Sequence, residues 1–192
     1  MIKAVVFDCF GVLTTDGWLA FRDTYFPEED TKHARANELN RQTDAGLLSA
    51  SQFEIEIAEL AGMPVDKARE IVNAHVRNEP LFQYIEQEIR PKYKIGLLSN
   101  ASEDYTDELF TSAQNALFDE KTFSFELGVV KPHPAMYETI ATKLGMLPEE
   151  CVFIDDREPF AQGARDVGMK GLQYHDMLQL RRELPALLQE VK

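Results

Sequence analysis

The sequence predicts an α/β fold: a doubly wound parallel sheet with a block of helices inserted near its start. Three observations support this. Apolar runs at 4–7, 93–98 and 151–154 have the length and the Val, Ile, Leu and Phe content of strands buried on both faces. From residue 93 onwards, such runs alternate with helical patterns, which is typical of parallel strands joined by right-handed crossovers. The long stretch between residues 14 and 93 contains no strand pattern.

The first strand, 4–8, is predicted to be central in the sheet, and the inserted helices follow it. Apolar residues at helical spacing indicate helices at 17–26, 29–45, 50–61, 65–77 and 80–90. Ser49 suits the N-cap of the third helix because Gln52 follows three residues later, and Pro64 suits the start of the fourth. Because these helices lie between the first two strands, we expect them to form an independent four-helix cap.

The remainder of the chain is predicted to complete the sheet and its covering helices. Further strands are expected at 93–98, 122–125, 151–154 and 171–174, and helices at 103–116, 134–145, 158–168 and 176–190. The sequence therefore predicts two domains: a core made of 1–14 and 86–192, and a cap of 15–85 inserted into it. We find no internal repeat and no low-complexity segment.

Composition and charge limit what the protein binds. The 192 residues are 44% hydrophobic, enough for one core and a small second one. A net charge of −13 argues against nucleic acid and against anionic membrane surfaces as partners. No apolar run approaches the ~20 residues of a membrane-spanning helix, and we expect no secretory signal. Cys9 and Cys151 are interpreted as reduced, buried residues. We therefore expect a cytoplasmic monomer or homodimer.

Asp8 follows the first apolar run and opens a loop that contains Gly11. A carboxylate at the carboxyl end of a buried parallel strand lies where open α/β sheets bind their ligands. The glycine three residues later allows a sharp turn that brings backbone N–H groups towards an anion. Asp8 is thus the first candidate site residue.

Three further features occur at comparable positions. Ser99 and Asn100 end the second apolar run, Lys131 lies in a proline-bounded loop before a helix, and the pair Asp155 and Asp156 follows the run at 151–154. The carboxyl ends of parallel strands share one edge of the sheet, so these side chains can converge with Asp8. In this order, the features resemble the four motifs of the haloacid dehalogenase-like (HAD) hydrolase superfamily. The resemblance covers nearly the whole chain.

The resemblance implies a Rossmann-like core, a helical cap inserted after the first motif, and hydrolase activity. It implies that Asp8 is the nucleophile, because a carboxylate becomes effective when it is held in line with a phosphoryl group. A divalent cation must then screen the repulsion between the two anions, and Mg²⁺ prefers oxygen ligands. The implied ligands are Asp8, the carbonyl of Phe10, Asp155 and Asp156, with Asp156 as the direct ligand of the pair.

The other two motifs imply phosphate binding. The hydroxyl of Ser99 and the amide of Asn100 suit the non-bridging oxygens of a phosphate. Lys131 supplies a positive charge that neutralises the transferred group and keeps Asp8 ionised. The implied activity is a magnesium-dependent phosphatase that acts on a small phosphorylated metabolite through an aspartyl-phosphate.

Phe10 is where the sequence departs from the phosphatase pattern. Typical members carry a second Asp at this position, which protonates the leaving group and activates water; phenylalanine does neither. We therefore expect aryl and acyl phosphates to react faster than alkyl phosphates. An aromatic residue here also resembles 2-haloacid dehalogenases, whose halide needs no proton, but those enzymes lack the paired acids and the metal. A third alternative is a non-catalytic binding protein that kept the pocket.

The cap is expected to select the substrate. Side chains that fall at helical spacing after the first motif loop, or before the turn at 44–46, are candidates to line the cleft: Trp18, Phe21, Arg22, Tyr25, Arg41 and Gln42. For the aromatic residues, packing inside the cap is an equal alternative. His33, His75, His133 and His175 show no spacing typical of metal ligands.

Overall fold

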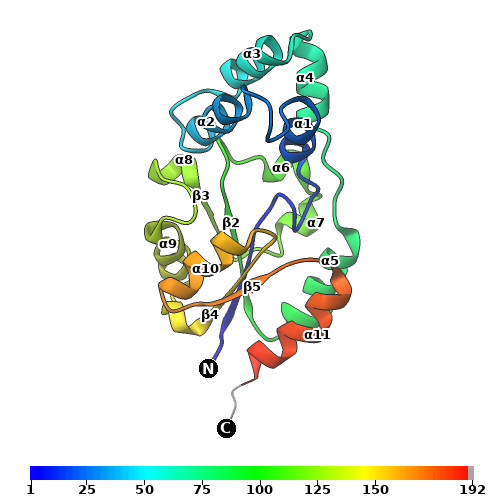
Figure 1. Cartoon of the computed structure of the whole chain (residues 1–192). Helices are drawn as coiled ribbons and strands as arrows, with labels where there is room; N and C mark the ends of the chain where they lie inside the picture. The colour runs from blue at the N-terminus through cyan, green and yellow to red at the C-terminus, as the bar shows by residue number, and fades with distance from the viewer. Residues whose placement is uncertain (190–192) are drawn as a thin grey trace.

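The computed structural model describes residues 1–189, in which a parallel sheet lies below a helical cap (Figure 1). The strands stand in the order β3-β2-β1-β4-β5. Their bounds are β1 (Ala4–Phe7), β2 (Lys94–Ser99), β3 (Glu120–Phe123), β4 (Cys151–Asp155) and β5 (Lys170–Gln173). The predicted α/β class, the parallel sheet and the central position of the first strand are confirmed.

The register of the strands decides which residues meet at the upper edge of the sheet. Phe7 of β1 pairs with Leu97 of β2 on one side and with Ile154 of β4 on the other. The next residue, Asp8, donates its backbone N–H to the carbonyl of Ile154 at 2.9 Å. Asp8 and Asp155 therefore leave the sheet side by side, because neighbouring parallel strands end at the same level.

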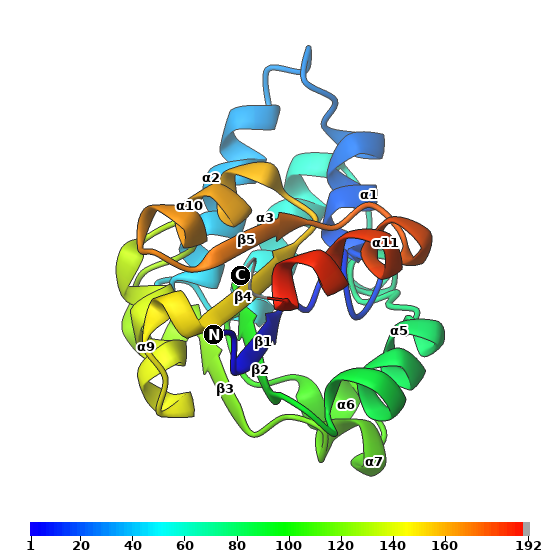
Figure 2. The same cartoon turned by 90° about the horizontal axis from the view of Figure 1, so that it is seen from below.

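Helices cover both faces of the sheet (Figure 2). Val5 and Phe7 pack on one face with residues of α5 (Glu79–Tyr84), the π-helical turn Ile85–Ile89 and α11 (Met177–Leu188). Ala4 and Val6 pack on the other face with α9 (Pro134–Leu144) and α10 (Glu158–Asp166). This alternation follows from the two-residue period of a strand and makes the sheet doubly wound.

The cap consists of four helices with an apolar core of their own. These are α1 (Gly17–Tyr25), α2 (His33–Asp44), α3 (Ala50–Ala61) and α4 (Val65–Val72). As expected, Ser49 caps α3 by accepting a hydrogen bond from the N–H of Gln52 at 3.2 Å. The helix ends at Gly62, whose φ of +68° places it in the left-handed region.

The packing moves one boundary of the predicted cap. The helix expected at 80–90 is α5 with the π-helical turn, and its apolar side chains join the core of the sheet. The cap therefore ends with α4, and the boundary that we placed at 85 lies inside a helix of the core domain. An apolar stripe shows that a helix will be buried, but its sequence does not say against which neighbour.

Several element bounds also differ from the prediction. The helix expected at 103–116 is two short helices, α6 (Thr106–Leu109) and α7 (Ser112–Asn115), because Thr111 and Gln114 form a capping box that starts a new helix. The strand expected at 122–125 lies two residues earlier, at Glu120–Phe123, because α8 (Ser124–Leu127) begins directly after it. Residues 190–192 lie outside the described residues, so the end expected at 190 for the last helix, and the end of the predicted core domain at 192, fall there.

The described residues also bear on the compositional predictions. None of their helices is both long enough and apolar enough to cross a membrane. Cys9 and Cys151 are both buried and unpaired, as expected.

Candidate active site

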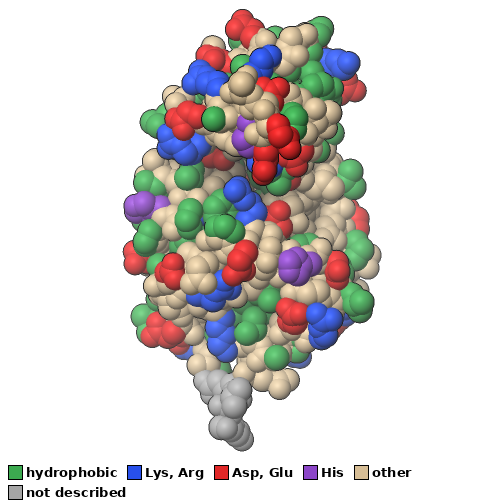
Figure 3. Space-filling model, viewed as in Figure 1, with side chains coloured by type: hydrophobic (Ala, Val, Ile, Leu, Met, Phe, Trp, Pro, Cys, Tyr) green, Lys and Arg blue, Asp and Glu red, His purple; other side chains and the backbone are tan. Residues whose placement is uncertain are grey.

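A large cavity separates the cap from the upper edge of the sheet. Its volume is about 1030 Å³, and Figure 3 shows the surface hollowed at this level, with acidic side chains gathered along the upper rim. Asp8, Phe10, Asn100 and Lys131 line it from the core. Cavities of this size commonly hold small-molecule ligands, so this is the candidate active site.

Asp8 is held at the floor of the cavity by the loop that follows β1. The residue is only 5% exposed, and the loop closes on itself because Leu13 donates its N–H to the carbonyl of Cys9 at 2.8 Å. Gly11 adopts a φ of +91°, and a Cβ atom there would lie 2.5 Å from the carboxyl carbon of Asp156. Glycine is therefore needed for the backbone of this loop to approach Asp156.

Lys131 joins two carboxylates inside the protein. Its Nζ lies 2.7 Å from Asp8 Oδ1 and 2.7 Å from Asp155 Oδ2, and the residue is only 2% exposed. The backbone N–H of Lys131 donates to Asn100 Oδ1 at 2.8 Å, which ties its loop to the end of β2. Burial acts to lower the pKa of Lys131, but the charges of Asp155 and Asp8 outweigh it and raise the pKa. Lys131 is therefore a permanent cation at this edge of the sheet.

Three carboxylates crowd around this one lysine, and the pKa values of two of them, Asp8 and Asp156, are raised. Burial, and then the charges of Asp155 and Asp156, raise the pKa of Asp8 against the opposing effect of Lys131. Burial and the charge of Asp155 raise the pKa of Asp156 to about 6. The site is thus short of positive charge, which favours a second cation.

The donor atoms fit a metal ion. Asp8, Asp155 and Asp156 each offer a carboxylate oxygen, and these oxygens all lie within 4.8 Å of one another. Asp155 has partners for both oxygens, since Lys131 contacts Oδ2 and the N–H of Arg157 donates to Oδ1 at 2.9 Å. Asp156 Oδ1 is buried and has no hydrogen-bond partner among the described residues. Such an orphaned acceptor suits a hard cation, which prefers oxygen ligands.

The structure brings most of the predicted core residues together, with one exception. Asn100 and Phe10 line the large cavity. Ser99 is 1% exposed and lines a separate small cavity with Cys9 and Phe123, and its hydroxyl lies 3.4 Å from the carbonyl of Asn100. The roles of Ser99 in phosphate binding and of the Phe10 carbonyl in metal binding stay predictions.

The cap candidates divide into two groups. Trp18, Arg22 and Arg41 line the cavity. Phe21 is fully buried in the apolar core of the cap, so its role is packing. Tyr25 packs against that core, and Gln42 donates to Glu38 at 2.7 Å; neither contributes to the cavity wall.

The sequence analysis did not identify three acidic residues of the cap that line the cavity: Asp16, Asp44 and Glu54. Asp16 caps α1 by accepting a hydrogen bond from the N–H of Leu19 at 3.0 Å. Asp44 ends α2 beside the turn at Gly46. The only signal in the sequence was the position of Asp44 before that turn, because its approach to the core depends on tertiary contacts.

Comparisons with known proteins agree with this architecture. The family model described as haloacid dehalogenase-like hydrolase matches residues 2–168. The chain is 30% identical to Phosphatase MT3486 of Mycobacterium tuberculosis over 185 residues, which cover 88% of this chain and 85% of that protein. It is 24% identical to D-ribitol-5-phosphate phosphatase of Bacteroides thetaiotaomicron over 212 residues, which cover 98% and 99%.

Solved structures share the fold. The HAD family enzyme bt-2542 of Bacteroides thetaiotaomicron, in complex with magnesium and inorganic phosphate, is similar with a TM-score of 0.69 and 23% identity over 94% of this chain and 99% of that one. The L-2-haloacid dehalogenase of Xanthobacter autotrophicus with chloropropionic acid covalently bound has a TM-score of 0.66 and 22% identity over 97% and 83%. At these identities the likeness shows the fold alone.

Proposed function

We propose that this chain, which belongs to the haloacid dehalogenase-like hydrolase family, is a magnesium-dependent phosphatase that acts on a small phosphorylated metabolite. The observation that carries this proposal is the buried cluster in which Lys131 lies 2.7 Å from both Asp8 and Asp155, beside the unpartnered Oδ1 of Asp156. The phosphatases among its relatives, and the neighbour solved with magnesium and phosphate, support the same class.

The reaction begins at Asp8. In the substrate complex, its carboxylate attacks the phosphorus in line, the P–O bond to the alcohol breaks, and an aspartyl-phosphate forms. Water then attacks this phosphorus, which releases phosphate and restores the carboxylate. Lys131 keeps Asp8 ionised and neutralises charge on the transferred group. Bound Mg²⁺, held by Asp8, Asp156 and the carbonyl of Phe10, would screen the repulsion between carboxylate and phosphate.

A 2-haloacid dehalogenase is the second candidate, and Phe10 is the observation that favours it. The aromatic ring lines the cavity and stands 5.0 Å from the ring of His75, where a carboxylic acid is expected in a phosphatase. Displacement of a halide by Asp8 needs no proton donor. The pair Asp155 and Asp156 argues against this function, because uncompensated acids repel a carboxylate substrate.

A product-release assay tests the proposal. Purified protein is incubated with p-nitrophenyl phosphate, a panel of sugar phosphates and nucleotides, and L-2-chloropropionate, each with Mg²⁺ and with EDTA. We expect phosphate release that requires Mg²⁺ and is absent in Asp8→Asn. Metal-independent chloride release would instead support the dehalogenase. Binding of phosphate without turnover of any compound would support the binding protein.

Three further statements stay predictions under this proposal. The substrate is a small molecule rather than nucleic acid or a membrane surface, the protein is cytoplasmic, and it is a monomer or homodimer. The expected preference for aryl and acyl over alkyl phosphates, which follows from Phe10, belongs to the same group. Because Phe10 cannot donate a proton, the proposal leaves one question about the mechanism: which residue protonates the alcohol when the P–O bond breaks.

A further inference from the structure

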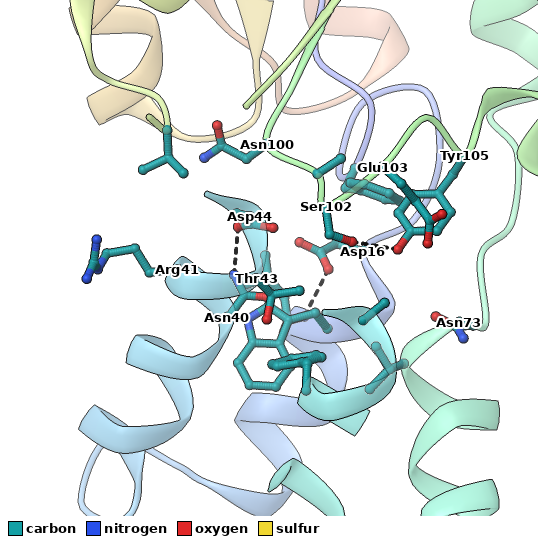
Figure 4. A pocket seen from close by; sticks show the side chains of 18 of the residues that line it. Asp16, Asn40, Arg41, Thr43, Asp44, Asn73, Asn100, Ser102, Glu103 and Tyr105 are labelled. Carbon is teal, nitrogen blue, oxygen red and sulfur yellow. Dashed lines mark hydrogen bonds between the residues drawn. The ribbon is translucent and has the colours of Figure 1, made fainter. Parts of the chain in front are cut away.

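Asp44 faces the catalytic cavity from the cap. It ends α2 and lines the same cavity as Asp8 and Lys131. Figure 4 shows Asp44 with Asn40 and Asp16 from the cap, and with Asn100 on the core side. Asn40 donates its side-chain N–H to Asp44 Oδ2 at 2.9 Å, which orients the carboxyl group.

A contact between cap and core holds Asp44 in place. Its backbone carbonyl accepts a hydrogen bond from the hydroxyl of Ser124, at the start of α8 in the core domain. The same hydroxyl oxygen accepts the N–H of Ala101 at 2.9 Å, and Ala101 directly follows Asn100. Asp44 is therefore positioned relative to the loop that follows β2, although it belongs to the cap.

The surroundings of Asp44 favour its protonated form. Burial, and then the negative charge of Asp16, raise its pKa to about 7, while Lys131 and Arg157 act in the opposite direction. The negative charge of Asp44 in turn helps to raise the pKa of Tyr105, which also lines the cavity. When two acids lie close together and hydrogen-bond donors stabilise the charge of only one of them, the other acid keeps its proton.

Asp16 is the better-solvated member of this pair. Burial raises the pKa of Asp16 too, but this residue accepts the backbone N–H of Leu19 at 3.0 Å as the N-cap of α1, which acts in the opposite direction and favours a carboxylate. The carboxyl group of Asp44 has one amide donor, Asn40. Glu54, the third cap acid in the cavity wall, is ion-paired with Arg69 at 2.7 Å. Asp44 is thus the cap acid with a proton to give.

The direction of attack places the leaving oxygen on the side of the cap. Asp8 lies at the floor of the cavity, and an in-line displacement expels the leaving group opposite to the nucleophile. We infer that Asp44 donates a proton to the leaving oxygen, in place of the acid that position 10 lacks, and that the substrates are phosphate esters of aliphatic, hydroxyl-bearing alcohols. This inference rests on the proposed function and deepens it.

The proposed steps balance. As Asp8 bonds to phosphorus, the P–O bond to the alcohol breaks with its electron pair, and the proton of Asp44 passes to that oxygen, so the neutral alcohol leaves. Water then approaches from the same side, again in line with the Asp8 oxygen. The resulting carboxylate of Asp44 takes a proton from this water as the aspartyl-phosphate breaks, which yields phosphate and restores both residues.

The walls of the cavity suit a hydroxylated alcohol. The cap and the linker that follows it place Asn37, Asn40 and Asn73 along the cavity, and the core adds Ser102. Amide and hydroxyl groups both donate and accept hydrogen bonds, which matches the pairing needs of alcohol hydroxyls. Aliphatic alcohols are poor leaving groups, so their esters are the substrates that need an acid most.

Two ester types and two matched variants test the inference. The kcat/KM of wild type, Asp44→Asn and Asp16→Asn is measured with glycerol phosphate and with p-nitrophenyl phosphate. This parameter reports only the steps up to release of the alcohol. We expect Asp44→Asn to lose about 10²-fold or more with glycerol phosphate, the range for general acid catalysis, and to keep nearly its full rate with p-nitrophenyl phosphate. Asp16→Asn, which retains the helix cap, should affect both esters alike.

The outcomes separate the inference from the function on which it rests. Equal losses of Asp44→Asn on both esters, no loss on either, or an ester-selective loss in Asp16→Asn would overturn the role of Asp44. Wild type that hydrolyses only the aryl ester would overturn the substrate class. Wild type that releases phosphate from no ester would overturn the proposed function itself. Asp44→Glu serves as a second variant, and partial recovery of glycerol phosphate hydrolysis relative to Asp44→Asn is expected.

Discussion

The core and the cap of this protein use charge in opposite ways. At the edge of the sheet, Lys131 is 2% exposed and lies between two carboxylates at 2.7 Å. In the cap, Arg41 forms an ion pair with Glu38 at 2.7 Å, but the arginine side chain is 56% exposed. Loss of one partner from a buried pair leaves an uncompensated charge, whereas exposed pairs contribute little because water and salt screen them.

This difference shows how the two regions divide the work. Removal of the cation from the core should affect chemistry and stability together, because Lys131 serves both. The cap has its own apolar core, built around residues such as Phe21 and Phe53, so its exposed ion pairs contribute little to holding it together. The following predictions test this division, from the largest expected effect to the smallest.

Asp8→Asn should abolish turnover while it preserves the fold. The amide fits the same space but is no nucleophile, so we expect a loss of about 10⁴-fold or more with p-nitrophenyl phosphate. Removal of one of three crowded carboxylates should leave thermal stability unchanged or raised, and both quantities are measured on the same preparation. Turnover at the wild-type level would show that the nucleophile is wrongly assigned.

Lys131→Met should reduce stability as well as activity. It leaves Asp8 and Asp155 buried without their cation, which typically costs about 3–5 kcal/mol. Urea unfolding of the metal-free protein measures this effect. The same substitution in the cap, Arg41→Met, is the matched control, and equal losses in the two variants would contradict the contrast between core and cap.

Asp156→Asn should weaken the metal site specifically. The buried Oδ1 of Asp156 has no hydrogen-bond partner among the described residues, and its replacement by a neutral amide removes the negative charge that would attract the cation. Calorimetric titration with Mg²⁺ should show binding in wild type and none in the variant. Asp166→Asn, on an exposed part of α10, is the control and should bind as wild type does. Equal affinities in all three proteins would refute the site.

Asp44 should make stability depend on pH. Its pKa is raised to about 7 in the folded protein, whereas an unfolded Asp titrates near its ordinary value of about 3.9. The folded state therefore holds the proton more tightly, and this stabilisation is present at low pH and is lost as the pH rises through about 7. The free energy of unfolding in urea is measured for wild type and Asp44→Asn at about pH 5 and about pH 8. Relative to wild type, the variant should be more stable at pH 8 than it is at pH 5. Parallel behaviour of the two proteins would contradict a raised pKa.

Arg41→Met should have the smallest effect on the fold. The exposed pair with Glu38 is screened by water and salt and contributes little, so the midpoint of urea unfolding should change little. Because Arg41 lines the cavity, any larger change should appear in KM for the natural ester. A loss of stability as large as that of Lys131→Met would show that the cap also depends on its charges.

The sequence by itself determined the sheet and the floor of the site. Asp8 and Asp155 each follow or end a short apolar run, and this pattern is local, so it can be recognised without knowing the fold. Parallel strands then bring their carboxyl ends to one edge, which is a general property of such sheets. For this reason the central strand and the convergence of Asp8, Lys131 and the acid pair were predictable.

Only the tertiary structure decided which residues of the cap reach this floor and which packing partner each helix takes. Asp44 is placed by Ser124, eighty positions further along the chain, and α5 joins the sheet rather than the cap. It also decided that Asp155 has partners for both oxygens while Asp156 keeps a free one. These outcomes depend on contacts between segments far apart in sequence, and the periodicity of a single segment carries no information about its distant neighbours.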